Sequence, residues 1–179
     1  MREMTDLLVL DLVDKGLVTD QITLTIEYDV ENLSDPTRRA LYHGPINTDA
    51  YGRKVPKHAH GTENLPDYTH STRQILRCMT DLYERIVNPH LTLRRITISA
   101  NRVIPESQVA SSAVEQLDLF TDYEVQSAEK KALEREDRIQ RAVLEIQRRY
   151  GKNAILKGMN LEKGARTQER NQQVGGHKA

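Results

Sequence analysis

The feature that most restricts the fold is the alternation of apolar and polar residues within Thr19–Tyr28. Ile22, Leu24 and Ile26 are separated by single polar residues. Because successive side chains of a strand point to opposite faces of a sheet, this run predicts a strand that is buried on one side only. The chain must therefore supply an apolar layer for one face of a sheet.

A second alternating run extends from Leu91 to Val103, and Pro105 closes it. It places Ile96 and Ile98 on the buried face, and Arg95 and Thr97 on the open face. The two runs together predict a sheet whose open face is polar.

Two amphipathic helices are predicted to cover the apolar face. The first runs from Met4 to Val13 and stops at Gly16, with Asp6 and Asp14 outside its apolar face. The second starts at Ser71 or Thr72 and ends at Asn88–Pro89. The apolar faces contain Met4, Leu7, Leu8 and Leu12 in the first helix, and Ile75, Met79, Leu82 and Ile86 in the second. Two helices on one face of a small antiparallel sheet give an α+β fold for residues 1–105.

Charge is unevenly distributed, although the 26 basic and 26 acidic residues balance. Between Arg38 and His60 the only acid is Asp49. The basic residues there are Arg38, Arg39, Arg53, Lys54 and Lys57, with His43, His58 and His60. After a polar connection over Glu31–Thr37, we expect Tyr51–Thr62 to form an edge strand. The basic stripe fits either a polyanion-binding surface or a solvated edge protected from pairing. A metal site on the three histidines is less favoured, since no cysteine or carboxylate cluster completes it.

The chain changes character after Pro105. We expect a linker without periodicity over 106–115, a charged helix over 124–151 and an irregular, glycine-rich tail over 152–179. The helix is interpreted either as a partner-binding element or as a solvated spacer. Cys78 is the single cysteine, so no internal disulfide forms. No apolar run reaches membrane-spanning length, and we expect a cytoplasmic protein.

A pentapeptide with three apolar side chains lies within the linker region 106–123. Gln116, Leu117, Asp118, Leu119 and Phe120 are flanked by polar residues, and Phe120 is the only phenylalanine in the chain. Such a segment is typical of a peptide that docks in a partner's groove. The alternative is the start of a helix packed on the domain. The five residues resemble the sliding-clamp-binding pentapeptide of bacteria, in which the terminal Leu-Phe pair fills a hydrophobic pocket.

Nearly the whole chain resembles the C-terminal part of a Y-family translesion DNA polymerase of the UmuC-like branch. The matching features are the basic segment Tyr51–Thr62, the helix from Ser71, Arg94-Arg95-Ile96, the pentapeptide, and the endings Lys157–Leu161 and Gly175–Ala179. The resemblance implies a little-finger domain that holds the backbone of duplex template-primer DNA. The implied contacts are Arg53, Lys54, Lys57, His58, Arg94, Arg95 and Thr97.

The resemblance also implies parts that this chain lacks. The family's little finger begins with a strand before the first helix, whereas Met1 already lies in the helical pattern. The palm, whose carboxylates hold Mg²⁺, is absent, so we expect no cofactor and no polymerase activity from this chain alone. We expect a gene fragment, an engineered piece or one part of a split enzyme that serves lesion bypass in an SOS-type response. Its expected partners are DNA, the sliding clamp and a polymerase core. The alternative is a regulator that competes for the clamp or the primer-template.

Overall fold

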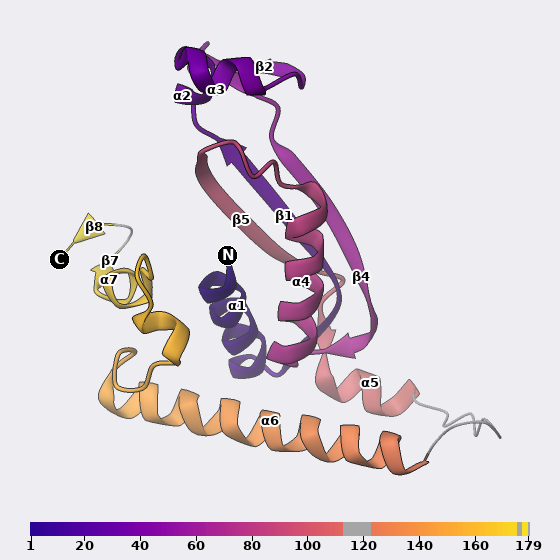
Figure 1. Ribbon diagram of the computed structural model, residues 1–179. Coiled ribbons are helices and arrows are strands. Elements are labelled where there is room, and N and C mark those ends of the chain that lie inside the picture. The colour runs from indigo at the N-terminus through magenta and orange to yellow at the C-terminus, as the bar shows by residue number, and fades with distance from the viewer. Residues whose placement is uncertain (113–122, 175–176, 179) are drawn as a thin grey trace.

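The centre of the molecule is a small antiparallel sheet. The structure, a computed structural model, describes residues 1–112, 123–174 and 177–178 (Figure 1). Three long strands lie in the order β4-β1-β5, and the short β6 pairs with the start of β1. Their bounds are Leu17–Tyr28 for β1, Ala59–Thr69 for β4, Leu93–Asn101 for β5 and Ile104–Pro105 for β6.

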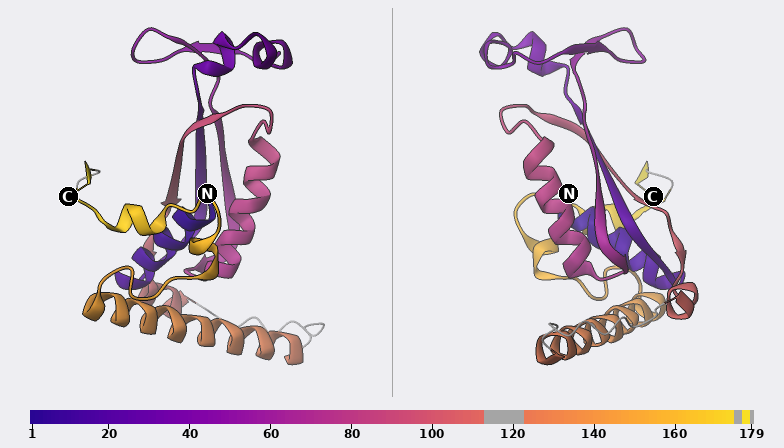
Figure 2. Two further views of the ribbon diagram at one scale, coloured as in Figure 1. Left: turned by 60° about the vertical axis from the view of Figure 1, so that its left-hand side comes forward. Right: turned by 90° about the vertical axis from the view of Figure 1, so that its right-hand side faces the viewer.

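Two helices, α1 (Arg2–Asp14) and α4 (Thr72–Ile86), cover one face of this sheet, as the right-hand view of Figure 2 shows. The alternation in β1 is confirmed, because Ile22, Leu24 and Ile26 are fully buried beneath the helices. The core between the layers also contains Val9, Leu12, Ile75, Met79 and Leu82. The predicted α+β architecture is therefore correct.

Helix α1 is buried on more than one side. Gly16, with φ of +63°, follows its last turn as expected. The prediction that Asp6 lies outside the packed face is wrong, since only 6% of this residue is exposed and it pairs with Lys157. The C-terminal tail lies against this side of α1, where Lys157 contacts Asp6, and Asn160 and Thr167 contact Glu3. Asp14 is exposed, as expected.

Helix α4 begins as the sequence predicts and packs closely on β4. The Ser71 side chain accepts a hydrogen bond from the Gln74 amide, which makes Ser71 the N-cap. A Cβ at Gly61 would come within 2.8 Å of Leu82 Cδ1, so a larger residue where the helix crosses β4 would force the Leu82 side chain to shift. Burial raises the pKa of the Cys78 thiol to about 11, with smaller contributions from nearby carboxylates, as this residue packs against the core.

The segment between β1 and β4 differs from the expectation in two ways. The connection after Tyr28 is not irregular but forms two short helices, α2 (Glu31–Ser34) and α3 (Pro36–Leu41), the latter capped by Asp35. The basic segment is not one edge strand. Its first part forms a separate hairpin of β2 (Ile46–Thr48) and β3 (Lys54–Pro56), and only the residues from Ala59 onward form the sheet edge.

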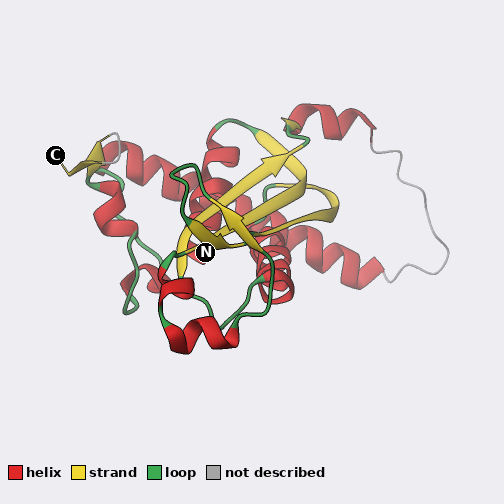
Figure 3. Cartoon of the chain, turned by 90° about the horizontal axis from the view of Figure 1, so that it is seen from above, coloured by secondary structure: helices red, strands yellow, loops and turns green. Residues whose placement is uncertain are grey.

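The C-terminal part folds back along one end of the sheet (Figure 3). Residues 106–112, expected to be an aperiodic linker, form the helix α5 (Glu106–Ser112). The long charged helix is confirmed as α6 (Tyr123–Tyr150). The irregular tail contains only short elements: a 3-10 turn η1 (Gly158–Leu161), α7 (Thr167–Asn171), β7 (Gln173–Val174) and β8 (His177–Lys178). Across the described ranges, no helix combines the length and apolar character needed to cross a bilayer.

Candidate nucleic-acid interface

The face of the sheet opposite α1 and α4 carries rows of polar side chains. The pairing register places Thr23 of β1 between Thr62 of β4 and Ser99 of β5. In the next row, Thr25 lies between His60 and Thr97. The residues of β4 and β5 that pair with Thr23 and Thr25 are polar as well, so polar side chains, most of them hydroxyls, cover this face.

Hydrogen bonds across the strands hold these side chains in place. The hydroxyls of Thr23 and Thr62 are 2.9 Å apart, and Thr25 Oγ1 lies 2.9 Å from His60 Nδ1. Asn101 Nδ2 donates to Thr23 Oγ1 at 2.7 Å. The face is thus a pre-ordered set of donors and acceptors, of the kind that contacts phosphate and sugar oxygens in DNA complexes.

Cationic side chains gather at one end of this face. Arg95 is exposed and lies 3.8 Å from Glu27. Arg94 lies at a shift in the β1–β5 register, and its guanidinium is 3.8 Å from Asp49. Both arginine side chains are exposed and their contacts are long, so these ion pairs contribute little and either guanidinium is available to a phosphate.

Asp49 organises the tip of the β2–β3 hairpin. Its carboxylate accepts hydrogen bonds from the amides of Tyr51 and Arg53, and from Arg53 Nε and Nη2 at 2.9 and 2.7 Å. The Arg53 side chain lowers the pKa of Asp49, and Asp49 in turn raises the pKa of Arg53. Gly52, with φ of +77°, completes the turn. The Arg53 guanidinium also lies 5.1 Å from the centre of the Tyr51 ring.

A cavity of about 580 Å³ separates the hairpin from the open face. The sheet contributes Thr25, Glu27, Arg94 and Arg95 to its lining, and His58 lies beside them. The hairpin supplies Asn47, Thr48, Asp49, Ala50, Tyr51, Val55 and Pro56. The hairpin and the end of the sheet therefore form one concave surface, which polar and apolar groups line in similar measure.

The predicted contact residues are only partly brought together. Arg94, Arg95 and His58 share the cavity, and Thr97 lies further along the same face. Lys54 is on the hairpin, where its ammonium donates to Thr48 Oγ1 at 3.0 Å. Lys57 is exposed in the connection to β4, and Arg53 is held by Asp49. Arg53 and Lys54 therefore belong to a separate hairpin and not to a strand of the main sheet.

Four polar residues at the other end of the face were not among the predicted contacts. Gln21 Nε2 donates to Asn64 Oδ1 at 2.9 Å, and Arg102 pairs with Asp20 at 2.9 Å while also donating to Asn64. Asn101 completes this group. The same alternation that identified Thr23 and Thr25 includes Gln21 and Asn101, so the sequence pattern could have identified those two.

Two further features of the sequence remain: the histidines, on which a metal site was the less favoured interpretation, and the predicted clamp-binding pentapeptide. The rings of His58 and His60 lie edge to face with centres 6.4 Å apart, and within the described ranges no group of three or more histidine, cysteine or acidic residues could hold a metal ion. The pentapeptide Gln116–Phe120 lies outside the described residues.

One of three comparisons with known proteins, the one with family models, agrees with the resemblance stated from the sequence. No curated protein and no solved structure matches this chain. The model of the impB/mucB/samB family C-terminal domain matches residues 1–119, which is about two thirds of the chain. The matched range includes the whole sheet, both covering helices and α5. The chain therefore belongs to the impB/mucB/samB family and contains the C-terminal domain of a UmuC-like Y-family DNA polymerase, a family of DNA repair enzymes.

Proposed function

We propose that this chain is the DNA- and clamp-binding portion of an error-prone translesion polymerase that acts in an SOS-type response. The open face and the β2–β3 hairpin hold the sugar-phosphate backbone of duplex template-primer DNA. Gln116–Phe120 docks on the bacterial sliding clamp.

The observation that carries the DNA-binding role is the polar face itself. Both α1 and α4 lie on the opposite side (Figure 2), and Arg94 and Arg95, at one end of the face, line a cavity together with the hairpin. Phosphate oxygens accept hydrogen bonds from such hydroxyls, amides and guanidinium groups. Apart from His60, the rows Thr62–Thr23–Ser99 and His60–Thr25–Thr97 contain no aromatic ring on which a base could stack. This composition supports binding to the backbone without reading the base sequence.

Salt dependence tests the DNA-binding role. Each phosphate contact contributes about 0.9 to the slope of log K against log salt concentration. We expect replacement of Arg94 and Arg95 by Ala to reduce the slope for duplex DNA by about 2, measured by fluorescence anisotropy. Arg77 and Arg138 are exposed on α4 and α6, away from the open face, so their double Ala variant is the matched control. An equal reduction in the control would contradict the assignment to this face.

Docking on the clamp is tested by direct binding. Replacing Leu119 and Phe120 by Ala removes both apolar anchors, so we expect an affinity loss of at least about 30-fold, corresponding to about 2 kcal/mol. Leu41→Ala is the control, because Leu41 is 57% exposed at a distant position on α3. Undiminished clamp binding by the double variant would exclude a docking role for this peptide.

A further inference from the structure

The tip of the β2–β3 hairpin carries an aromatic side chain that the fold does not use. Tyr51 is 78% exposed, the highest value among the large hydrophobic side chains that the structure describes. Contact with a partner would remove the apolar ring from water and so stabilise a complex. In the right-hand view of Figure 2, the hairpin projects over the face of the sheet opposite α4. The ring therefore lies beside the surface that is proposed to bind DNA.

A hydrogen-bonded turn holds this ring in place. The Asp49 amide donates to Arg53 O at 2.9 Å, and the Gly52 amide donates to Asp49 O at 3.0 Å. The Asp49 carboxylate accepts a hydrogen bond from the Tyr51 amide at 2.9 Å. Because the backbone on both sides of Tyr51 is fixed, little conformational entropy is lost when a ligand contacts the ring.

The base of the hairpin is fixed to the domain as well. The Tyr42 hydroxyl donates to Pro45 O at 2.6 Å and accepts a hydrogen bond from the Lys57 amide at 3.2 Å. The Lys57 amide also donates to Pro45 O at 2.9 Å. Tyr42 belongs to the hydrophobic core and Pro56 is fully buried. The fold therefore sets the position of Tyr51 relative to the sheet.

Two guanidinium groups lie close to the ring. Arg53 Nη2 is 2.7 Å and Arg94 Nη1 is 3.8 Å from the same oxygen, Asp49 Oδ2. The Arg53 guanidinium lies over one face of the Tyr51 ring, and the high exposure of this side chain leaves the other face open. Tyr51, Arg94 and Arg95 also line one cavity. A phosphate bound by Arg94 is therefore held near an open aromatic face.

We propose that Tyr51 stacks on an unpaired base of the DNA strand whose phosphates Arg94 and Arg95 bind, an inference that rests on the proposed DNA-binding function. A base within a duplex is covered on both faces by its neighbours, whereas an unpaired base can turn out onto an aromatic ring. Such stacking tolerates every base, because each has a π-face. The ligand of the hairpin tip is thus a single-stranded nucleotide that adjoins a duplex.

Two tasks are then divided on one surface. The hydroxyls and arginines of the sheet bind the phosphates of paired and unpaired nucleotides alike, whereas Tyr51 adds affinity only where a base is free. Arg53, which Asp49 holds in place, orients the ring and is a positioning residue. The chain therefore binds a junction of duplex and single strand, such as a template that extends beyond its primer, in preference to a continuous duplex.

Fluorescence anisotropy of the full chain with matched DNA probes tests this assignment. A blunt duplex is compared with duplexes that carry a short overhang, at the 5′ or the 3′ end, of unpaired thymidines or of abasic nucleotides. The abasic overhang keeps the phosphates and lacks the bases. At one of the two ends, we expect the parent to bind the thymidine overhang at least about 5-fold more tightly than the abasic one, corresponding to about 1 kcal/mol. Tyr51→Ala should abolish this preference, and Tyr51→Phe should keep it.

Control variants separate the possible outcomes. Tyr150 is 69% exposed at the end of α6, far from the hairpin (Figure 1), so Tyr150→Ala should behave like the parent. Tyr51→Ala should leave the salt slope unchanged, because the ring contacts no phosphate, whereas loss of Arg94 and Arg95 should reduce it. Equal binding of thymidine and abasic overhangs by the parent, or a preference that survives in Tyr51→Ala, overturns the stacking role alone. If the parent binds none of the duplexes, the proposed DNA-binding function fails, and the stacking role with it.

Discussion

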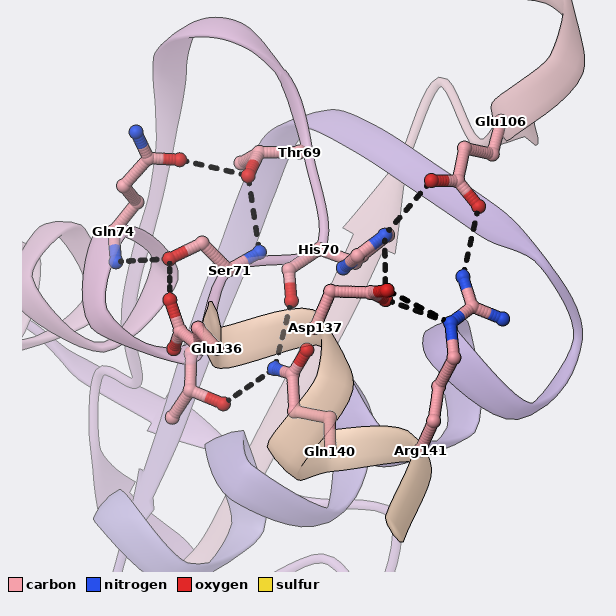
Figure 4. A network of polar contacts seen from close by, with 10 residues as sticks. Thr69, His70, Ser71, Gln74, Glu106, Glu136, Asp137, Gln140 and Arg141 are labelled. Carbon is pink, nitrogen blue, oxygen red and sulfur yellow. Dashed lines mark hydrogen bonds and ion pairs between the residues drawn. The ribbon is translucent and has the colours of Figure 1, made fainter. Parts of the chain in front are cut away.

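The sheet domain and the C-terminal segment are held together by different forces. In the sheet domain, apolar side chains from β1, α1 and α4 interlock, and Ile22, Leu24 and Ile75 are completely buried. Of the described residues after Pro105, only Leu144 packs against this core. The segment is attached instead by carboxylates and amides, and Figure 4 shows those that α6 presents to the start of α4.

The attachment of the tail to α1 shows how this works. Glu3 Oε1 accepts hydrogen bonds from Thr167 Oγ1 at 2.6 Å and from Asn160 Nδ2 at 3.2 Å, and Glu3 Oε2 accepts one from the Arg166 amide at 3.0 Å. Asp6 and Asp14, on the same helix, pair with Lys157 and Arg148. Apolar burial does not depend directly on pH, whereas carboxylate contacts do. The two regions should therefore respond differently to the same perturbation.

The largest effect is expected in the core. Leu24→Ala removes a fully buried side chain and should lower the free energy of unfolding by about 3 kcal/mol. Urea denaturation measures this loss. Leu161→Ala, at a position 69% exposed in the tail, should change it by less than about 0.5 kcal/mol. Equal losses would show that the tail is part of the same cooperative core.

A smaller, local effect is expected from Glu3→Ala. Asn160 and Thr167 are buried, and loss of the carboxylate removes a hydrogen-bond partner from each, which should weaken tail docking by about 2 kcal/mol. Hydrogen exchange over residues 158–171 should accelerate about 30-fold, while the amides of β1 keep their protection. Glu162→Ala, at an exposed position in the tail, is the control. Loss of protection in β1 would contradict a local role.

Acid should release the tail before it unfolds the sheet. Burial raises the pKa of Glu3, but hydrogen bonds from Thr167, Arg166 and Asn160 outweigh it, so the pKa falls from 4.5 to about 2. A depressed carboxylate pKa stabilises docking fully above pH 4.5, and this contribution is lost as the pH falls toward about 2. Because trypsin is inactive at such pH, the rate at which pepsin cleaves the tail is measured as a function of pH. The Glu3→Ala variant should lack this pH dependence.

The smallest effect is expected from Arg148→Ala. Its side chain is 68% exposed in the pair with Asp14, and exposed ion pairs contribute about 0.5 kcal/mol or less. Thermal unfolding at low and high salt should differ little between this variant and the parent. A loss above about 1 kcal/mol would mean that isolated surface pairs hold α6 as firmly as the hydrogen bonds that the buried Gln140 donates to His70 O and Thr72 Oγ1.

Much of the sheet domain could be predicted because its signals are local. Alternation identified β1 and β5, the Ser71 cap located the start of α4, and Gly16 marked the end of α1. Such patterns indicate which side of a helix or strand faces the apolar core, and each pattern is complete within about ten residues of sequence. The polar open face followed from the same alternation.

The sequence alone determined β1, β5 and the presence of the two covering helices, because short periodic stretches encode them, and its motifs indicated the family. Only the tertiary structure decided that the basic segment splits into a hairpin and an edge strand, because pairing depends on distant partners. It also decided that Asp6 is buried and that α6 lies across the start of α4. Polar contacts such as Glu136 with Ser71 join residues 65 positions apart, and no local pattern encodes them.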